Sequence, residues 1–146
     1  MTAIKPKFDI EKLNLHYGAF HALKDINMQI DEHKITAFIG PSGCGKSTFL
    51  KTLNRMNDLV EGVKIEGKVE LDGKNIFKDM DAITLRHKVG MVFQSFNLFN
   101  NMTVLENCLV GQTKVLKKDP KEAEEVAMKY LTKVGMAPYI LSLIHI

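Results

Sequence analysis

The stretch Gly40-Pro41-Ser42-Gly43-Cys44-Gly45-Lys46-Ser47 is the most informative part of this chain. It fits the phosphate-binding loop pattern of a glycine, four residues and then Gly-Lys-Ser. Gly43 and Gly45 permit backbone dihedrals that other residues avoid, so successive N–H groups can converge on phosphate oxygens. The stretch therefore predicts a site for a phosphate-bearing ligand.

The polar residues at the end of the loop supply the remaining chemistry. The Lys46 ammonium can reach the β and γ phosphates of a nucleotide, and the positive end of the following helix adds to the attraction. The Ser47 hydroxyl is small and correctly placed to ligate Mg²⁺. For Cys44, a small side chain packed under the loop is favoured over a redox switch. The predicted ligand-binding residues here are Gly40, Pro41, Ser42, Gly43, Cys44, Gly45, Lys46, Ser47 and Thr48.

Both flanks of the loop fit this prediction. Residues 35–39 are apolar at nearly every position, which is typical of a central strand covered on both faces. Residues 46–57 carry apolar side chains at helical spacing, among them Phe49, Leu50 and Leu53. The order strand, loop, helix is the one that the motif requires, and it indicates an α/β fold.

The rest of the first hundred residues predicts strands. Alternating apolar residues indicate half-buried antiparallel strands, and Asp72-Gly73 indicates a hairpin turn. Residues 89–93 form another short apolar run that predicts a strand. The alternating residues are Phe8, Ile10, Leu13 and Leu15, then Ile26, Met28 and Ile30, then Val69, Leu71 and Ile76.

Beyond residue 100 the pattern predicts helices. Thr103 and Glu106 form a capping-box pattern, and Asp119-Pro120 marks a second helix start. Gly135 stands where a left-handed C-terminal cap is expected. The second helix carries a core-facing apolar stripe formed by Ala123, Val126, Ala127, Tyr130, Leu131 and Val134.

Composition excludes several classes of protein. The 146 residues are 45% apolar, and 20 Lys and Arg against 17 Asp and Glu leave a formal charge of +3, too small to indicate nucleic-acid binding. No window is apolar enough for a membrane span, and residues 1–10 lack the apolar run of a signal peptide, so we expect a cytosolic chain. Cys44 and Cys108 show neither disulfide nor zinc spacing.

Two residues outside the loop carry a resemblance to the ATP-binding cassette (ABC) family. Tyr17, in Leu15-His16-Tyr17-Gly18, precedes the loop, and Gln94 follows the apolar run at 89–93. The resemblance implies that Tyr17 stacks on adenine, and that Gln94 contacts Mg²⁺ and the attacking water, making Lys46 and Gln94 the catalytic candidates. It also implies a RecA-like P-loop NTPase core, an antiparallel β-subdomain and the start of an α-helical subdomain. A GTPase would carry an Asn-Lys-x-Asp element, which is absent from the sequence, so ATP is favoured over GTP.

The resemblance points to two classes of transported substrate. Residues 36–49, the run Arg55-Met56-Asn57-Asp58 and residues 63–73 resemble phosphate-importer ATPases, whereas residues 94–99 and 102–107 resemble polar amino-acid importer ATPases. Phosphate is favoured, and the amino-acid importer stays an alternative. A soluble ABC ATPase without a membrane partner is a further alternative, against which the importer-like residues 94–99 argue.

The resemblance covers the front half of a complete cassette. We find no Leu-Ser-Gly-Gly-Gln signature, no strand ending in Asp-Glu and no switch histidine, since His145 stands in the wrong context. We therefore expect a truncated chain that binds nucleotide at most. We assign residues 1–100 to the ATPase core and β-subdomain, 101–140 to the start of the helical subdomain, and 141–146 to a non-native tail.

The resemblance also implies the partners of the whole subunit. They are a second ATPase subunit in a homodimer, transmembrane permease subunits and, indirectly, a periplasmic substrate-binding protein. The expected location is peripheral, on the cytoplasmic face of the cell membrane, and the expected cofactors are ATP and Mg²⁺.

Overall fold

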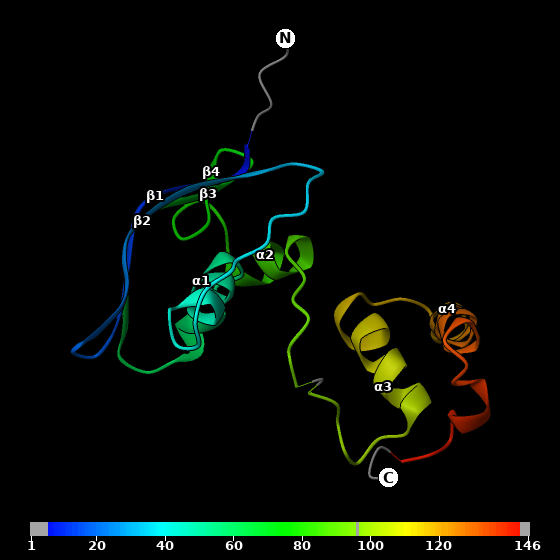
Figure 1. Ribbon diagram of the computed structural model, residues 1–146. Coiled ribbons are helices and arrows are strands. Elements are labelled where there is room, and N and C mark those ends of the chain that lie inside the picture. The colour runs from blue at the N-terminus through cyan, green and yellow to red at the C-terminus, as the bar shows by residue number, and fades with distance from the viewer. Residues whose placement is uncertain (1–5, 96, 144–146) are drawn as a thin grey trace. The chain divides into compact units, whose positions relative to one another are not determined.

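The structure is a computed structural model that describes residues 6–95 and 97–143 (Figure 1). The chain divides into two compact units, Met1–Met91 and Val92–Ile146. The division falls after Met91, whereas the boundaries assigned at residues 100 and 140 remain predictions. Within the described residues, no helix is both long enough and apolar enough to cross a bilayer.

Four antiparallel strands form the sheet of the first unit. They are β1 (Pro6–Tyr17), β2 (Phe20–Asp31), β3 (Val63–Leu71) and β4 (Lys74–Asn75), in the spatial order β2-β1-β3-β4. β1 pairs with both β2 and β3, so Tyr17 lies opposite Phe20 on one side and Val63 on the other. Asp72 and Gly73 both have positive φ, as a tight hairpin turn requires. The predicted antiparallel strands and hairpin are confirmed.

A bulge in β1 brings its backbone close to β3. The pairing register of these strands shifts between Glu11 and Asn14, where Lys12 has a left-handed φ of 49°. On β3, Gly67 has a φ of +100°, and a Cβ there would overlap the Lys12 carbonyl group. Glycine is therefore required at this crossing.

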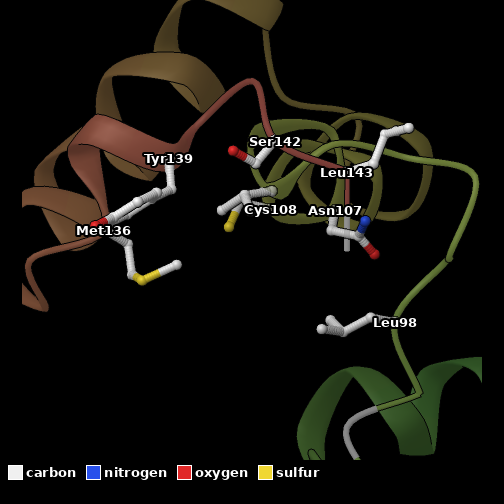
Figure 2. Close-up of a pocket in the computed structure, with 8 residues that line it drawn as sticks. Leu98, Asn107, Cys108, Met136, Tyr139, Ser142 and Leu143 are labelled. Carbon is white, nitrogen blue, oxygen red and sulfur yellow. The ribbon is translucent and has the colours of Figure 1, made fainter. Parts of the chain in front are cut away.

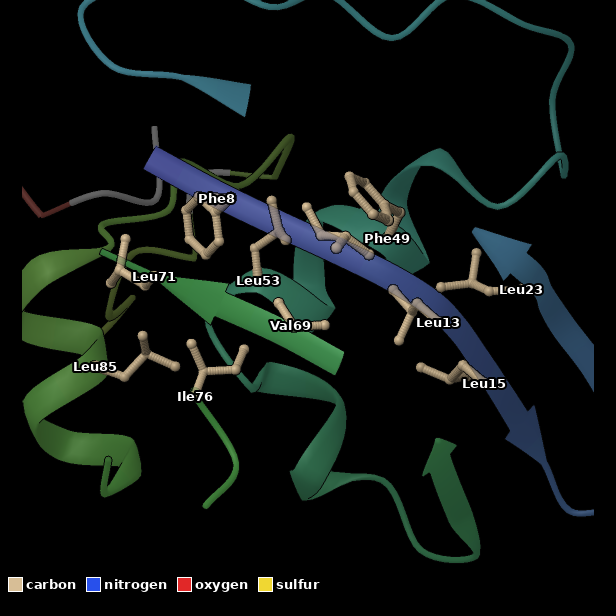
Figure 3. Close-up of a cluster of buried hydrophobic side chains, with 11 residues drawn as sticks. Phe8, Leu13, Leu15, Leu23, Phe49, Leu53, Val69, Leu71, Ile76 and Leu85 are labelled. Atoms are coloured by element: carbon tan, nitrogen blue, oxygen red, sulfur yellow. The ribbon is translucent and has the colours of Figure 1, made fainter. Parts of the chain in front are cut away.

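The hydrophobic core of the first unit gathers side chains from the sheet and from two helices, α1 (Lys46–Leu53) and α2 (Ala82–Lys88) (Figure 3). Side chains on a strand alternate between its faces, so every second residue of a strand reaches this core. The buried members are Phe8, Ile10, Leu13, Leu15, Leu23, Phe49, Leu53, Val69, Leu71, Ile76 and Leu85.

Two segments predicted as strands are not strands. Residues 34–40 and 89–93 have no regular secondary structure, and Ile35, Ile39 and Val92 are 101%, 96% and 92% exposed. A strand needs a hydrogen-bonded neighbour, and neither segment pairs with a strand in the described part of the chain. These predictions were wrong because an apolar run indicates only that a segment tends to be buried. It does not show that a partner strand is present.

The predicted helix over residues 46–57 is shorter than expected. α1 ends at Leu53, because Arg55 adopts a left-handed φ of 59° and a 3-10 turn, η1 (Met56–Leu59), follows it. This turn carries Asn57, whose side chain is completely buried.

The second unit is helical. α3 (Val104–Val110) begins with the predicted capping box between Thr103 and Glu106, and continues into a π-helical turn, η2 (Gly111–Val115). α4 (Pro120–Lys133) is capped by Asp119 and followed by Gly135 at a φ of +75°. A 3-10 turn, η3 (Ala137–Tyr139), comes next. The predicted helix starts and the left-handed cap are confirmed.

The predicted core-facing stripe of α4 is only partly buried. Ala123, Ala127 and Leu131 are buried, but Tyr130 and Val134 are 59% and 70% exposed. The packing against α3 and its neighbours covers one narrow face of α4, so the edge of the apolar stripe stays in solvent. Phe96 and residues 144–146, which end the predicted tail and include His145, lie outside the described residues.

Candidate functional site

The loop of residues 40–47 leads directly into α1. Gly43 and Gly45 have φ values of +81° and +96°, in the left-handed region that favours glycine. A Cβ on Gly45 would lie 3.0 Å from Leu23 Cδ2 and 3.3 Å from the Ala22 carbonyl oxygen. The loop therefore packs on β2, and this contact fixes its place in the first unit.

The N–H groups of the loop are mostly unpaired. Cys44 donates to the Pro41 carbonyl oxygen at a distance of 3.4 Å. Neighbouring N–H groups at the start of a helix form an anion-binding site, and the helix dipole strengthens it. Within the part of the chain that the structure describes, no protein acceptor is bonded to the amides of Gly43, Gly45, Lys46 and Ser47.

The Lys46 ammonium lies within the loop. Its Nζ donates to the carbonyl oxygens of Gly40 at 2.7 Å and of Pro41 at 2.6 Å, and it lies 3.4 Å from Cys44 Sγ. None of the ion pairs between described residues involves Lys46. Its neighbours are neutral groups, so its positive charge is available to an anionic ligand.

Cys44 leaves no room for a side chain at position 40. A Cβ on Gly40 would lie 2.9 Å from Cys44 Sγ, which is closer than real side chains approach. Cys44 itself is exposed. The thiol thus lies against the loop without being sealed beneath it, and its predicted packing role stays a prediction.

Ser47 and Thr48, in the first turn of α1, differ in their surroundings. Ser47 is exposed, and its hydroxyl bonds to no protein group among the described residues. The Thr48 carbonyl oxygen accepts from Thr52 Oγ1 at 2.8 Å and from Asn57 Nδ2 at 2.9 Å. Residues 6–95 and 97–143 contain no group of three or more His, Cys, Asp or Glu side chains that could hold a metal ion. The role of Ser47 as a Mg²⁺ ligand stays a prediction.

Tyr17 ends β1 in the same unit as the loop. It is half-buried and packs against the core, and its hydroxyl donates to Asn57 Oδ1 at 2.9 Å. Two residues earlier, Leu15 pairs with Leu23, the residue on which Gly45 packs. The strands β1 and β2 thus connect the predicted base-binding residue with the phosphate loop.

Gln94 belongs to the second unit, where it is exposed. Tyr17 and residues 40–48 all belong to the first unit. The expected contact of Gln94 with Mg²⁺ and water stays a prediction.

Each unit also contains an apolar cavity. One, of about 320 Å³, lies beside the loop and is lined by Lys46 and Phe49 together with β2 side chains. A second one, of about 510 Å³, lies in the second unit, which has a further cavity along α4, and is lined by Met136, Tyr139 and Cys108 among others (Figure 2). Burial raises the pKa of the Cys108 thiol, and no charged side chain lines this second cavity. The second cavity therefore adds no group that binds phosphate, whereas the first is lined in part by the loop residues Gly45 and Lys46.

Comparison with known proteins establishes the family. A model of the family described as ABC transporter matches residues 23–144. The chain belongs to the ABC transporter family. The match includes the phosphate loop, Gln94 and the helices of the second unit.

Two bacterial relatives are similar over most of this chain. Both are phosphate import ATP-binding proteins PstB. The one from Borreliella afzelii is 52% identical over 137 residues, covering 90% of this chain and 52% of the relative. The one from Rubrobacter xylanophilus is 44% identical over 128 residues, covering 87% of this chain and 45% of the relative. The chain thus spans about half the length of the curated relatives it matches.

A solved structure shows the same fold. The ATP-binding cassette MJ0796, a dimer in a post-hydrolysis state bound to ADP and Pi, is 25% identical, with a TM-score of 0.74 over 94% of this chain and 61% of that one. The predicted P-loop NTPase fold with an antiparallel subdomain is confirmed.

Proposed function

We propose that this chain is part of the nucleotide-binding subunit of an ABC phosphate importer, and that it binds Mg·ATP at residues 40–48. The observation that carries the proposal is the set of unpaired amides at Gly43, Gly45, Lys46 and Ser47, at the start of α1. The family to which the chain belongs supports the assignment. For this chain by itself the proposed activity is binding, and hydrolysis belongs to the whole subunit.

Each residue has a distinct role in this proposal. The loop amides and the Lys46 ammonium hold the β and γ phosphates, and Ser47 ligates Mg²⁺, which neutralises phosphate charge when it is bound. The Tyr17 ring offers a largely apolar face on which adenine can stack. Gln94 has a neutral amide that can both donate and accept a hydrogen bond near the metal and the attacking water.

Inorganic phosphate is the substrate that the relatives support. Both are named as phosphate import proteins, at 52% and 44% identity. The run Arg55-Met56-Asn57-Asp58, which resembles phosphate-importer ATPases, also favours phosphate. The alternative, a polar amino acid, rests on the runs at residues 94–99 and 102–107, and it predicts that the neighbouring genes encode an amino-acid permease instead of a phosphate permease.

The partners follow from the same proposal. The whole subunit pairs with a second copy, since the related cassette was solved as a dimer, and it acts on transmembrane permease subunits from the cytoplasmic face of the membrane. A periplasmic binding protein delivers the substrate to that permease. Neighbouring genes that encode neither a permease nor a binding protein would favour the soluble ATPase instead.

Calorimetric titration of the purified chain with Mg·ATP tests the proposal. Lys46→Ala removes a charged hydrogen-bond donor, so affinity should fall about 10- to 100-fold. Lys51→Ala is the matched control, because Lys51 is an exposed lysine on the same helix. Its affinity should equal that of the unmodified chain. Absence of saturable binding, or equal binding by the Lys46→Ala variant, contradicts the proposed function.

A further inference from the structure

Asn57 is the centre of a buried polar network that joins Tyr17 to α1. The side chain of Asn57 is completely buried, and its Oδ1 accepts from the Tyr17 hydroxyl at 2.9 Å. Its Nδ2 donates to the Thr48 carbonyl oxygen at 2.9 Å and to Thr52 Oγ1 at 2.7 Å. The amide thus uses both of its N–H groups and its oxygen.

The network permits only one orientation of the Asn57 amide. The Thr48 carbonyl oxygen can only accept, so the side facing Thr48 must be the NH₂ group. The oxygen then faces Tyr17, whose hydroxyl has to donate. A tyrosine at this position therefore has a partner that a phenylalanine would lack.

The η1 turn that carries Asn57 is itself held by Arg55, the residue before it. Arg55 donates from Nε to Asp58 Oδ2 at 2.7 Å, and from Nη1 to the carbonyl oxygens of Ile76 at 3.1 Å and Met80 at 3.0 Å. The two bonds from Nη1 fix the turn against the segment between β4 and α2. The run Arg55-Met56-Asn57-Asp58 thus stabilises the local structure beside the site.

We propose that Asn57 is a positioning residue for the nucleotide base. It holds the Tyr17 hydroxyl, and so the ring, in a fixed relation to Thr48, one residue beyond the proposed Mg²⁺ ligand Ser47. This inference rests on the proposed function, because it gives Tyr17 its orientation toward adenine. It assigns Asn57 to recognition of the base and leaves the phosphates to the loop.

Binding of two ligands distinguishes a role of Asn57 in positioning the base from a merely structural role. Mg·ATP uses both the base and the phosphates, whereas Mg·tripolyphosphate, which lacks the base, uses the loop alone. In Asn57→Ala, affinity for Mg·ATP should fall about five- to tenfold, as expected for a lost buried hydrogen bond, while affinity for tripolyphosphate stays unchanged. The matched control is Asn54→Ala, since Asn54 is also buried but bonds to Met56 and Met91 instead of Tyr17.

Tyr17→Phe keeps the ring and removes only the hydroxyl, so it tests the inference even if Asn57→Ala does not fold. It should weaken Mg·ATP binding about threefold, and the double variant should be no weaker than Asn57→Ala alone, because both remove the same bond. The inference is overturned if Asn57→Ala loses affinity for Mg·ATP and for Mg·tripolyphosphate equally. It is also overturned if neither variant loses affinity for either ligand. If the unmodified chain binds neither ligand, the proposed function fails and this inference fails with it.

Discussion

Gly45 in the phosphate loop packs directly against Leu23 on β2. A Cβ on Gly45 would lie 3.0 Å from Leu23 Cδ2, and the φ of +96° already disfavours any side chain there. The shape of the loop thus depends on the strand beneath it as well as on its own glycines. The antiparallel sheet thus supports the loop through this packing on β2.

Gly45→Ala should therefore impair both stability and binding. The strained φ and the contact with Leu23 should lower the free energy of unfolding by about 1–3 kcal/mol, and displacement of the loop should weaken Mg·ATP binding. Gly62→Ala is the control, because Gly62 has a similar φ of +72° but open space around it. Chemical denaturation and calorimetric titration measure the two effects. Equal Mg·ATP affinity in the two variants would show that the packing on β2 is unimportant.

Gly67→Ala should destabilise the sheet more than Gly62→Ala. The obstacle at Gly67 is the Lys12 carbonyl group, which is backbone and cannot rotate away as a side chain can. The expected loss in unfolding free energy is about 2–4 kcal/mol. Urea denaturation measures it, and a loss no greater than that of Gly62→Ala contradicts the close approach of β1 and β3.

Leu13→Ala should show where the core of the first unit lies. Leu13 is completely buried in the cluster, so its truncation should cost about 2–5 kcal/mol. Ile35→Ala is the control, because Ile35 is 101% exposed and should cost close to nothing. Urea denaturation of both variants compares the two sites. A large loss for Ile35→Ala would mean that residues 34–40 form a buried strand after all.

The capping box of α3 should respond to acid. The Thr103 backbone N–H and hydroxyl donate to Glu106 Oε2 at 2.7 and 3.0 Å, and hold the pKa of that carboxyl below its usual range. Because this pKa is lower in the folded chain, the bonds stabilise the fold above the unfolded-state pKa, and the stabilisation is lost as the pH falls through the folded-state pKa. Carboxyl NMR should show Glu106 titrating lower than glutamate in an unfolded peptide. Thr103→Ala should reverse only part of the shift, since the backbone N–H remains, and an unchanged pKa would contradict the capping role.

Local patterns in the sequence predicted the local parts of the fold. The alternation in β1 and β2, the turn at Asp72-Gly73 and the capping box at Thr103 each depend on residues close together in the chain. Their geometry follows from side-chain spacing and preferred dihedrals. The phosphate loop is predictable for the same reason, because its glycines, lysine and serine are contiguous.

Features that depend on distant residues could not be predicted. Residues 34–40 can form a strand only beside a partner strand, and their apolar pattern does not show whether such a partner is present. In the sequence, Asn57 stands only within the run that resembles phosphate importers. Its bond to Tyr17 spans 40 positions in the sequence, and only the folded sheet brings the two side chains together.

The most direct test of the central claim is an amide NMR titration of the chain with Mg·ATP and, separately, with Mg·tripolyphosphate. Both ligands should shift the backbone N–H signals of Gly43, Gly45, Lys46 and Ser47, because these amides are free to bind phosphate oxygens. Only Mg·ATP should also shift the signals around Tyr17. If the four amide signals stay in place at ligand concentrations that saturate binding, or if no binding occurs, the loop is not the phosphate site.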